Sequence, residues 1–331
     1  MNLEKWNEYH QNQTERDVYK LLHLFDEVLK MVVMYYGLQA IKEEFFSFTL
    51  YPVLNNKVKS LFEKFNNVFS QKMNYCIDKH YQLSKDKFKD VFTNIHHSQK
   101  GEDTLQSLVM KEKKCMLSGR VWNLTQQYRT EIEMALDVAI HEGTPANQLT
   151  SVLKKYLQNP DTLFRKYRDK NGILQLSQKA KEYRSGQGVY RSAYKNAERL
   201  ARTEINIAYR TADIERWQSM EMIAGYEIKR SKHPHGCEIC DMMKGIYPKS
   251  FVWVGNHPNC RCYMTPIFKK DMVGKEITIN NKLTEWISDN ENRITNAKGI
   301  PMFLWGIDNQ SKGISQKIIQ AIQFFSKKKL P

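Results

Sequence analysis

Apolar residues recur at helical spacing along the first part of the chain. From Thr14 to Tyr36 they repeat every three or four positions, which predicts an amphipathic helix that ends at Gly37. A second helix is expected after Pro52, because one apolar stripe continues as far as Cys76. Its place in that stripe favours Cys76 as a small buried residue over a ligand or redox group. The two stripes comprise Val18, Leu21, Leu22, Phe25, Val28, Leu29 and Val32, and then Val58, Leu61, Phe62, Phe65, Phe69, Met73 and Cys76.

The middle of the chain continues the helical pattern. A helix is expected from Ser118 to Gly143, where the glycine supplies a left-handed stop. Thr144 caps the next helix, which has proline at its first position. Residues 159–188 are charged and interrupted by glycines, which is typical of a connector with partial order. A long helix is expected over residues 189–224.

The pattern changes after Gly225. The short β-prone runs "YEIKR", "FVWV" and "RCYMTPIF" alternate with His, Pro, Gly and Asn. After Lys270 a polar stretch leads to an amphipathic helix that stops at Gly299, and a short basic helix closes the sequence. This last helix has isoleucines on one side, so it docks either on a partner or on the core of its own chain.

These patterns predict a mainly α protein, with an elongated helical N-terminal region followed by a small α+β knuckle domain rich in Cys and His. We expect four parts. They are a helical N-terminal region (1–117), a helical middle region with its connector (118–188), the long helix with the knuckle (189–268) and a C-terminal helical tail (269–331). A chain of 331 residues is long enough for more than one such unit.

The charge of the chain suggests a class of partner. A formal net charge of +15 predicts attraction to polyanions, with nucleic acid as the first candidate, because Lys and Arg release the counterions condensed on phosphates. No RNP, helix-turn-helix or basic-zipper signature accompanies the charge, so sequence-specific recognition is not expected. No apolar run reaches the roughly 20 residues that span a bilayer. The N-terminus does not resemble a secretory signal, and we expect a protein made and kept in a cytoplasm.

Four of the six cysteines and three of the nine histidines lie within residues 233–262. Zinc prefers tetrahedral sets of thiolates and imidazoles, and two ligands separated by two residues can bind from one turn, as Cys237 and Cys240 could. His233 and His235 are more typical of an exposed turn. Two ligand sets remain open: Cys237, Cys240, Cys260 and Cys262, or Cys237, Cys240, His257 and Cys260 with Cys262 beside them. We expect a structural zinc, with packed thiols or disulfides as the alternatives, and a cytoplasm disfavours disulfides.

Catalytic motifs are missing from the sequence. A zinc deaminase needs a His followed two residues later by Glu, and no His in this chain has that neighbour. The stretch "HEGTP" at His141 lacks the second histidine of a metalloprotease. Phosphate-binding P-loops, dinucleotide-binding glycine fingerprints and nucleophile elbows are also absent. We therefore expect no enzymatic activity and no small-molecule substrate.

The order of motifs in the second half is similar to that of a known family. "ARTEINIAYRTADIERW" from Ala201 is followed by "CEIC", "DMMKGIY" and "HPNCRCYMTP". This order resembles the C-terminal domain of the phage Mu protein F-like head morphogenesis, or minor capsid, proteins. The resemblance covers residues 189–268 and, more weakly, the helices upstream. The motif residues are Arg202, Thr203 and Glu204 on the helix, then Cys237, Cys240, His257, Pro258, Cys260, Arg261 and Cys262.

The resemblance implies a low-copy protein of a phage or prophage head, which acts in capsid or procapsid assembly near the portal and can contact packaged DNA. Its partners would be the portal and other head proteins, without a membrane. It would be found in the virion or, during assembly, in the host bacterial cytoplasm, and no catalysis is implied. On physical grounds, Arg202 and Glu204 either pin the long helix to the Cys/His cluster through charge-assisted hydrogen bonds or belong to an ordinary solvated helix face, and the spacing leaves both open.

Two other functions remain open at this stage. The first is a toxin-like or nucleic-acid-processing effector that uses the Cys/His cluster, although the sequence after Lys270 is short for a catalytic module. The second is a non-specific DNA-binding protein, whose binding would depend steeply on salt. A head protein docked at the portal should instead bind protein first.

Overall fold

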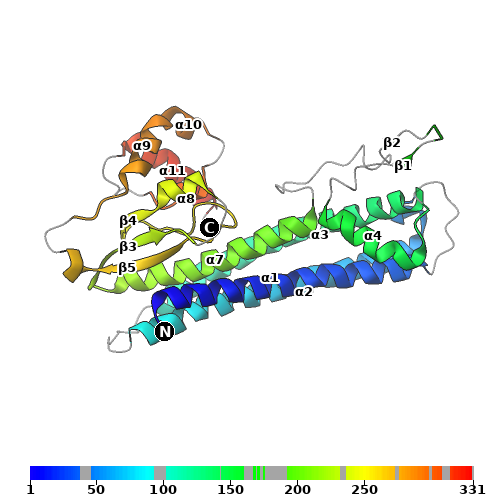
Figure 1. Ribbon diagram of the computed structural model, residues 1–331, viewed down its shortest axis with the longest axis horizontal. Helices are drawn as coiled ribbons and strands as arrows, with labels where there is room; N and C mark the ends of the chain where they lie inside the picture. Colours follow the sequence, from blue (N-terminus) through cyan, green and yellow to red (C-terminus); the bar gives the residue numbers. More distant parts are fainter. Residues whose placement is uncertain are drawn as a thin grey trace. The chain divides into compact units, whose positions relative to one another are not determined.

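The computed structural model describes residues 1–37, 46–92, 102–141, 143–159, 167–168, 170–171, 174–175, 192–231, 236–272, 276–297, 300–307 and 314–329. In these residues long helices come first, and a small antiparallel sheet with short helices follows (Figure 1). The predicted fold class, mainly α with a small α+β region at the C-terminal side, is confirmed. Most of the expected connector lies outside the described residues.

The first helices are α1 (Leu3–Gly37), α2 (Pro52–Val91), α3 (Glu102–His141) and α4 (Ala146–Gln158). Two short strands, β1 (Tyr167–Arg168) and β2 (Leu174–Gln175), pair ahead of the long helix α7 (Ala193–Ser219). The C-terminal region contains β3 (Ile223–Lys229), α8 (Glu238–Met243), β4 (Gly245–Pro248), β5 (Tyr263–Phe268), α9 (Asn281–Asp289), α10 (Glu291–Thr295) and α11 (Gln316–Lys329). None of the described helices is long and apolar enough to cross a membrane.

The first helix begins earlier than its apolar pattern predicts. α1 starts at Leu3, whereas the stripe of apolar residues begins only after Thr14. The reason is that the inward positions of its first turns are polar, because Asn7, His10 and Thr14 are all buried. A search for apolar periodicity cannot detect a buried face made of polar side chains.

Two further helix ends differ from the prediction. α3 begins at Glu102 rather than Ser118, so one helix crosses the boundary expected between the first two parts of the chain. α7 ends at Ser219, five residues before the expected end at 224, because β3 begins at the β-branched residue Ile223.

The chain divides into two compact units, each assembled from separate segments. Unit 1 comprises Met1–Glu15, Tyr75–Glu112 and Arg202–Pro331, and unit 2 comprises Arg16–Asn74 and Lys113–Ala201. The four consecutive parts expected from the sequence stay a prediction.

An aromatic core holds unit 2 together. Phe25 of α1 meets the rings of Phe65 and Phe69 of α2 edge to face, with ring centroids 4.9 and 5.7 Å apart. The hydroxyl of the buried Tyr128 on α3 donates a hydrogen bond to the Phe25 carbonyl at 2.6 Å. Edge-to-face packing adds to the burial of such large apolar surfaces, so this cluster ties three helices to one another.

In unit 1 the sheet has the strand order β4–β3–β5 with antiparallel neighbours. A single apolar core joins the sheet to α7 on one side and to the C-terminal helices on the other (Figure 1). Ile318, Ile319 and Ile322 of α11 are buried in this core, so the last helix packs on its own chain. Cys76 is buried, as its position in the stripe predicts.

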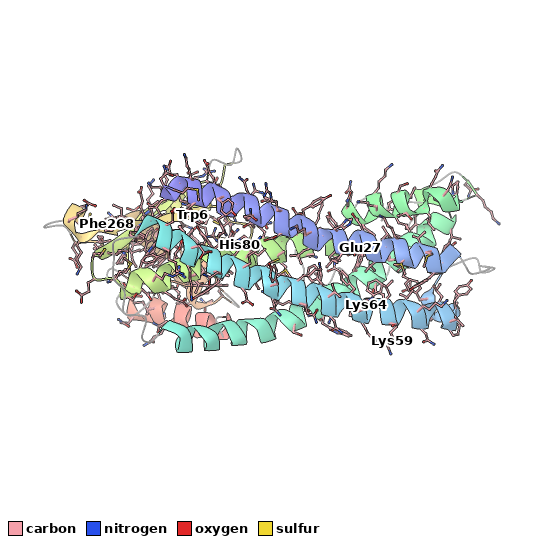
Figure 2. The ribbon with its side chains drawn as sticks, turned by 90° about the horizontal axis from the view of Figure 1, so that it is seen from below. Trp6, Glu27, Lys59, Lys64, His80 and Phe268 are labelled. Carbon is pink, nitrogen blue, oxygen red and sulfur yellow. The ribbon has the colours of Figure 1, made fainter. Side chains whose placement is uncertain are left out.

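The first turns of α1 belong to unit 1 and are tied to its other segments (Figure 2). The indole Nε1 of Trp6 donates a hydrogen bond to the Asp90 carboxylate of α2 at 2.7 Å. The ring of His10 stacks on Tyr209 of α7, with centroids 3.7 Å apart, and lies edge-on to His80 of α2. Several independent contacts therefore seat this segment.

A buried ionic cluster fixes α7 against α2 within unit 1. The ammonium Nζ of Lys87 lies 2.5 Å from Oδ2 of Asp213, and both side chains are almost fully buried. The hydroxyl of Ser84 donates to the other carboxylate oxygen of Asp213, and Arg216 donates to that hydroxyl at 2.7 Å. Burial lowers the pKa of Lys87, while Asp213 acts in the opposite direction. Because a buried charge is costly without its partner, this cluster selects one alignment of the two helices.

Removing one member of the buried pair should destabilise unit 1. Lys87→Met leaves the Asp213 carboxylate buried without its cation, and we expect a loss of about 3–5 kcal/mol in the free energy of unfolding. The loss in the free energy of unfolding is measured by denaturant titration, with hydrogen exchange in residues 75–91 and 202–219 as the readout. The double variant Lys87→Met/Asp213→Asn should recover much of that loss, because the carboxylate that lost its cation is then neutral as well. Equal losses in the single and double variants would contradict this account.

Candidate metal centre

Two segments of unit 1 bring the predicted ligands together. Cys237 is the N-cap of α8 and Cys240 lies in its first turn, so both thiols project from one turn. His257, Cys260 and Cys262 lie in the loop that connects β4 to β5. The backbone N–H of Cys260 donates to the His257 carbonyl at 3.1 Å, which folds this loop into a tight turn.

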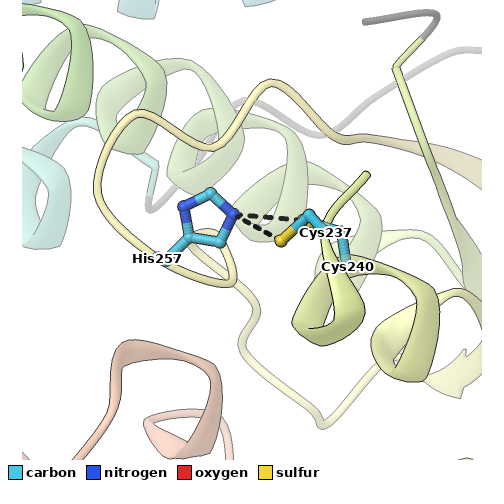
Figure 3. Close-up of side chains that lie close together, drawn as sticks. All are labelled: Cys237, Cys240 and His257. Atoms are coloured by element: carbon cyan, nitrogen blue, oxygen red, sulfur yellow. Dashed lines mark hydrogen bonds between the residues drawn. The ribbon is translucent and has the colours of Figure 1, made fainter. Parts of the chain in front are cut away.

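The imidazole of His257 faces the two thiols of α8 (Figure 3). Its Nε2 lies 3.4 Å from the Sγ of Cys237 and 3.2 Å from the Sγ of Cys240. Its other ring nitrogen, Nδ1, lies 2.8 Å from the Pro258 carbonyl. A proton on Nδ1 satisfies that carbonyl and leaves the Nε2 lone pair directed at the thiols, which is the orientation that a metal-binding histidine needs.

The loop contributes two further thiols. Cys237, Cys240 and His257 form one group of possible ligands, and Cys240, Cys260 and Cys262 form another, with the ligand atoms of each group within 4.8 Å of one another. Cys240 belongs to both groups, so all five predicted ligands gather around it. The described cysteines are all free of disulfide bonds.

The electrostatics of the cluster favour a thiolate at its centre. Hydrogen bonds from the thiols of Cys260 and Cys262 hold the pKa of Cys240 well below its usual range. The contact with Cys240 raises the pKa of Cys262, and it raises the pKa of His257 to about 9. The proton donors of the cluster thus surround the Cys240 sulfur. A metal cation can take the place of these protons, because metal binding to thiols and imidazoles releases protons.

A buried arginine of α7 holds the backbone of the ligand loop. Nη1 of Arg210 donates to the Val254 carbonyl at 2.9 Å, and Nη2 donates to the carbonyls of Cys260 and Cys262 at 2.6 and 2.8 Å. The guanidinium also lies over the ring of Trp253, 4.7 Å from its centroid. One side chain therefore satisfies three carbonyls in a segment that precedes strand β5.

Gly255 lets the loop approach this arginine. Its φ of +138° lies in a region that L side chains rarely adopt, and a Cβ there would lie 2.5 Å from Nη1 of Arg210. Glycine is required at this position by both backbone conformation and space.

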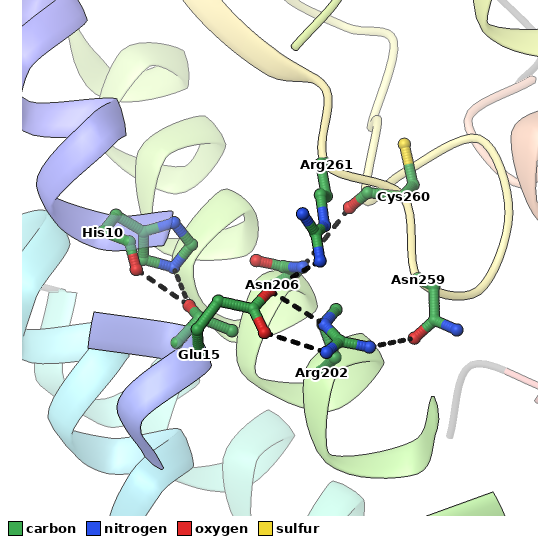
Figure 4. Close-up of polar contacts among 8 residues, drawn as sticks. His10, Glu15, Arg202, Asn206, Asn259, Cys260 and Arg261 are labelled. Atoms are coloured by element: carbon green, nitrogen blue, oxygen red, sulfur yellow. Dashed lines mark hydrogen bonds and ion pairs between the residues drawn. The ribbon is translucent and has the colours of Figure 1, made fainter. Parts of the chain in front are cut away.

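The motif residues of the helix also reach the ligand loop (Figure 4). Nη1 of Arg202 donates to the side-chain Oδ1 of Asn259 at 3.3 Å, and the Asn259 backbone N–H donates to the Thr203 hydroxyl at 3.1 Å. Asn206 donates to the Cys260 carbonyl at 3.3 Å. Arg202 thus connects the helix to the loop that carries the ligands, through its hydrogen bond to Asn259.

The other predicted residues take different positions. Glu204 is half-buried on α7, and Pro258 is half-buried in the loop, where its carbonyl faces the His257 ring. Arg261 projects towards α1, where its Nη2 lies 2.8 Å from Oε1 of Glu15. His233 and His235 lie outside the described residues.

Several supporting residues were not found from the sequence. Asn206 and Arg210 follow Arg202 at steps of four residues, so a polar stripe on one helix face was the available signal. Asn256 lies in the loop, where its amide contacts the Sγ of Cys240 at 3.4 Å and accepts a hydrogen bond from Trp253 at 2.7 Å. Nothing in the sequence pattern marks Asn256.

The donor set suits a metal ion that prefers sulfur and nitrogen. Tetrahedral zinc, with Zn–S of about 2.3 Å and Zn–N of about 2.0 Å, holds sulfur and nitrogen ligands roughly 3.5 Å apart. The distances of 3.4 and 3.2 Å from His257 to the two thiols of α8 are close to that value. In the described part of the chain, these two overlapping groups are the ones that could hold a metal ion.

No family model, curated protein or solved structure matches the chain. The geometry of the cluster and the order of the sequence motifs are therefore the two supports for a functional proposal.

Replacing Arg210 should destabilise the ligand loop. Arg210→Ala removes the guanidinium donor from three carbonyls and leaves the Cys260 carbonyl with the longer hydrogen bond from Asn206, and we expect a loss of about 3 kcal/mol in the free energy of unfolding. Arg210→Lys should lose most of the same amount, because one ammonium cannot reach all three oxygens. Denaturant titration gives the value, and the exposed Arg293→Ala in α10 is a control of equal charge change. Arg210→Ala and Arg293→Ala with the same midpoint would argue against this role.

Proposed function

We propose that the chain is a minor head protein of a phage or prophage, which acts in capsid or procapsid assembly near the portal. The observation that supports this proposal best is the contact between the two motifs that carry the family resemblance. Arg202 and Thr203 of the "ARTE" segment hold Asn259 of the "HPNCRC" segment. Two motifs that lie 57 residues apart, measured from Arg202 to Asn259, thus form one structural unit.

The architecture of unit 1 suits an adaptor. Two parts of unit 1 support the Cys/His cluster. One is α7, and the other is the apolar core that the C-terminal helices complete. Its buried arginine is used in binding backbone carbonyls, which is a structural task. A rigid knuckle of this kind can present loops and helix faces to the portal and to other head proteins.

We further propose that the cluster holds one structural zinc through Cys237, Cys240, His257 and Cys260, with the Cys262 thiol beside it. The orientation of His257 favours this set over four cysteines, because its Nε2 faces Cys237 and Cys240 while Nδ1 is satisfied by Pro258. Bound zinc would link α8 to the loop after β4 and so stabilise the folded knuckle.

DNA is a second proposed contact. The exposed lysines of α2 in unit 2 are Lys57, Lys59, Lys64 and Lys72, and Lys59 and Lys64 are labelled in Figure 2. Within this stretch of α2, Glu63 is the single acidic residue. Exposed lysines attract phosphates without reading sequence, which fits a protein that works near packaged DNA.

Metal analysis tests the proposed zinc. The tag-free protein should contain one zinc per chain, and chelation should release it and expose reactive thiols. Cys240→Ser and His257→Ala should each abolish stoichiometric zinc, whereas Cys262→Ser should retain it. Mass spectrometry of the native protein reads the metal content. Zinc kept by His257→Ala and lost from Cys262→Ser would select the four-cysteine set, and no zinc in the wild type would reject the metal.

The head-protein function is tested in the phage or induced prophage that carries the gene. Purified heads should contain the chain at low copy by quantitative mass spectrometry, and disruption of the gene should reduce the yield of infectious particles. The Arg293→Ala variant should restore the yield, whereas Cys240→Ser should not. Heads that lack the chain, with an unchanged yield after disruption, would refute the assignment.

A further inference from the structure

Glu15 of α1 lies between two arginines from different parts of unit 1 (Figure 4). Its carboxylate accepts hydrogen bonds from Nε and Nη2 of Arg202 on α7, at 3.1 and 2.9 Å. Nη2 of Arg261 lies 2.8 Å from the same carboxylate. One acidic side chain thus joins an arginine of the motif helix to an arginine of the ligand loop.

Both arginines are connected to the metal cluster. Arg261 is the residue between Cys260 and Cys262, so the position of its side chain is linked to the direction in which both thiols point. Arg202 reaches the same loop through Asn259, which has the left-handed backbone conformation with φ of +64°. A residue in this conformation needs support from its neighbours to keep its place.

The loop is therefore restrained from two sides. On one side Arg210 of α7 binds the carbonyls of Cys260 and Cys262. On the other side Glu15 holds the side chain of Arg261. In the sequence Arg261 is the residue between Cys260 and Cys262. The contacts of Arg210 with these carbonyls are made without α1, whereas Arg261 is held by Glu15 of α1.

Loss of the Glu15 charge would leave two guanidinium groups close together without a shared anion. Arg202 has only 8% of its side chain exposed, so it depends on this partner more than Arg261, which is 34% exposed. The Glu15 side chain itself is 41% exposed, and solvent screening keeps the effect of removing its charge moderate. The expected consequence is a looser loop within a protein that still folds.

We propose that Glu15 is a positioning residue for the metal site, through which zinc binding is coupled to the seating of the first turns of α1. This inference rests on the zinc site proposed above. Coupling between two sites is reciprocal, so a carboxylate that improves zinc binding must itself be held better when zinc is bound. The first turns of α1 are then a part of the knuckle, although Glu15 and Arg202 lie 187 positions apart in the sequence.

Two contacts of the first turns of α1 are made without Glu15. The stack of His10 on Tyr209 and the hydrogen bond from Trp6 to Asp90 stay in place when Glu15 changes. A Glu15 variant should therefore fold, which makes its effect on metal binding measurable.

The test compares Glu15→Gln with Glu4→Gln in the full chain. Both variants remove one negative charge from α1, and Glu4 is exposed. Chelator competition should show roughly tenfold weaker zinc binding for Glu15→Gln and no change for Glu4→Gln. The zinc-free forms of the two variants should melt at similar temperatures, while zinc should raise the melting temperature of Glu15→Gln less. If Glu15 had a purely structural role, the zinc-free and zinc-bound forms of Glu15→Gln would both melt at temperatures lowered by the same amount.

A double variant locates the coupling. Arg261→Gln should weaken zinc binding to a similar degree. Adding Glu15→Gln to this variant should weaken zinc binding little further, because both changes break the same contact between Glu15 and Arg261. Hydrogen exchange in residues 3–15 should slow when zinc is added to the wild type and not when it is added to Glu15→Gln.

The outcomes separate the two proposals. Wild-type affinity in Glu15→Gln, with zinc bound by both proteins, overturns the coupling and leaves the zinc site intact. A wild type that binds no zinc overturns both.

Discussion

The loop that carries His257, Cys260 and Cys262 depends on one buried guanidinium. Arg210 donates hydrogen bonds to three buried backbone carbonyls, and Asn206 adds a second, longer one to the carbonyl of Cys260. A buried acceptor without a donor costs about 1–3 kcal/mol, so the loop could not stay in this conformation on its own. Gly255 provides the space that the guanidinium occupies. Helix α7, which carries Arg210, thus determines how the candidate metal ligands of the loop are arranged.

The same helix shows how polar groups can specify an apolar core. Arg202, Asn206 and Arg210 face the ligand loop, and Asp213 pairs with Lys87 of α2. Each of these contacts is satisfied in one alignment only, because a shift by one residue would bury an unpaired charge. The apolar residues of α7 provide most of the burial, while its polar residues determine which surfaces meet.

The sequence allowed some of these features to be predicted and concealed others. Apolar periodicity identified the helices, and the spacing of cysteines identified the cluster, since both signals are local. The start of α1 was missed because its buried side chains include Asn7 and His10, which no hydrophobic pattern reveals. Glu15 was missed because its partners lie more than 180 residues away, and a single exposed-looking glutamate on a helix gives no local sign of them.

The way unit 1 is assembled has a consequence for synthesis of the protein. Its segments include Met1–Glu15 at the beginning of the sequence and α11 near the end, whereas every segment of unit 2 has been translated once Ala201 is added. Unit 2 can therefore fold on the ribosome while the first fifteen residues still lack their partners on α7 and in the ligand loop. The apolar core that contains Cys240, Cys260 and Cys262 also contains the isoleucines of α11, so this core is complete only when α11 has joined it. A chain that lacks α11 would therefore retain every segment of unit 2 and lack part of the apolar core around the knuckle.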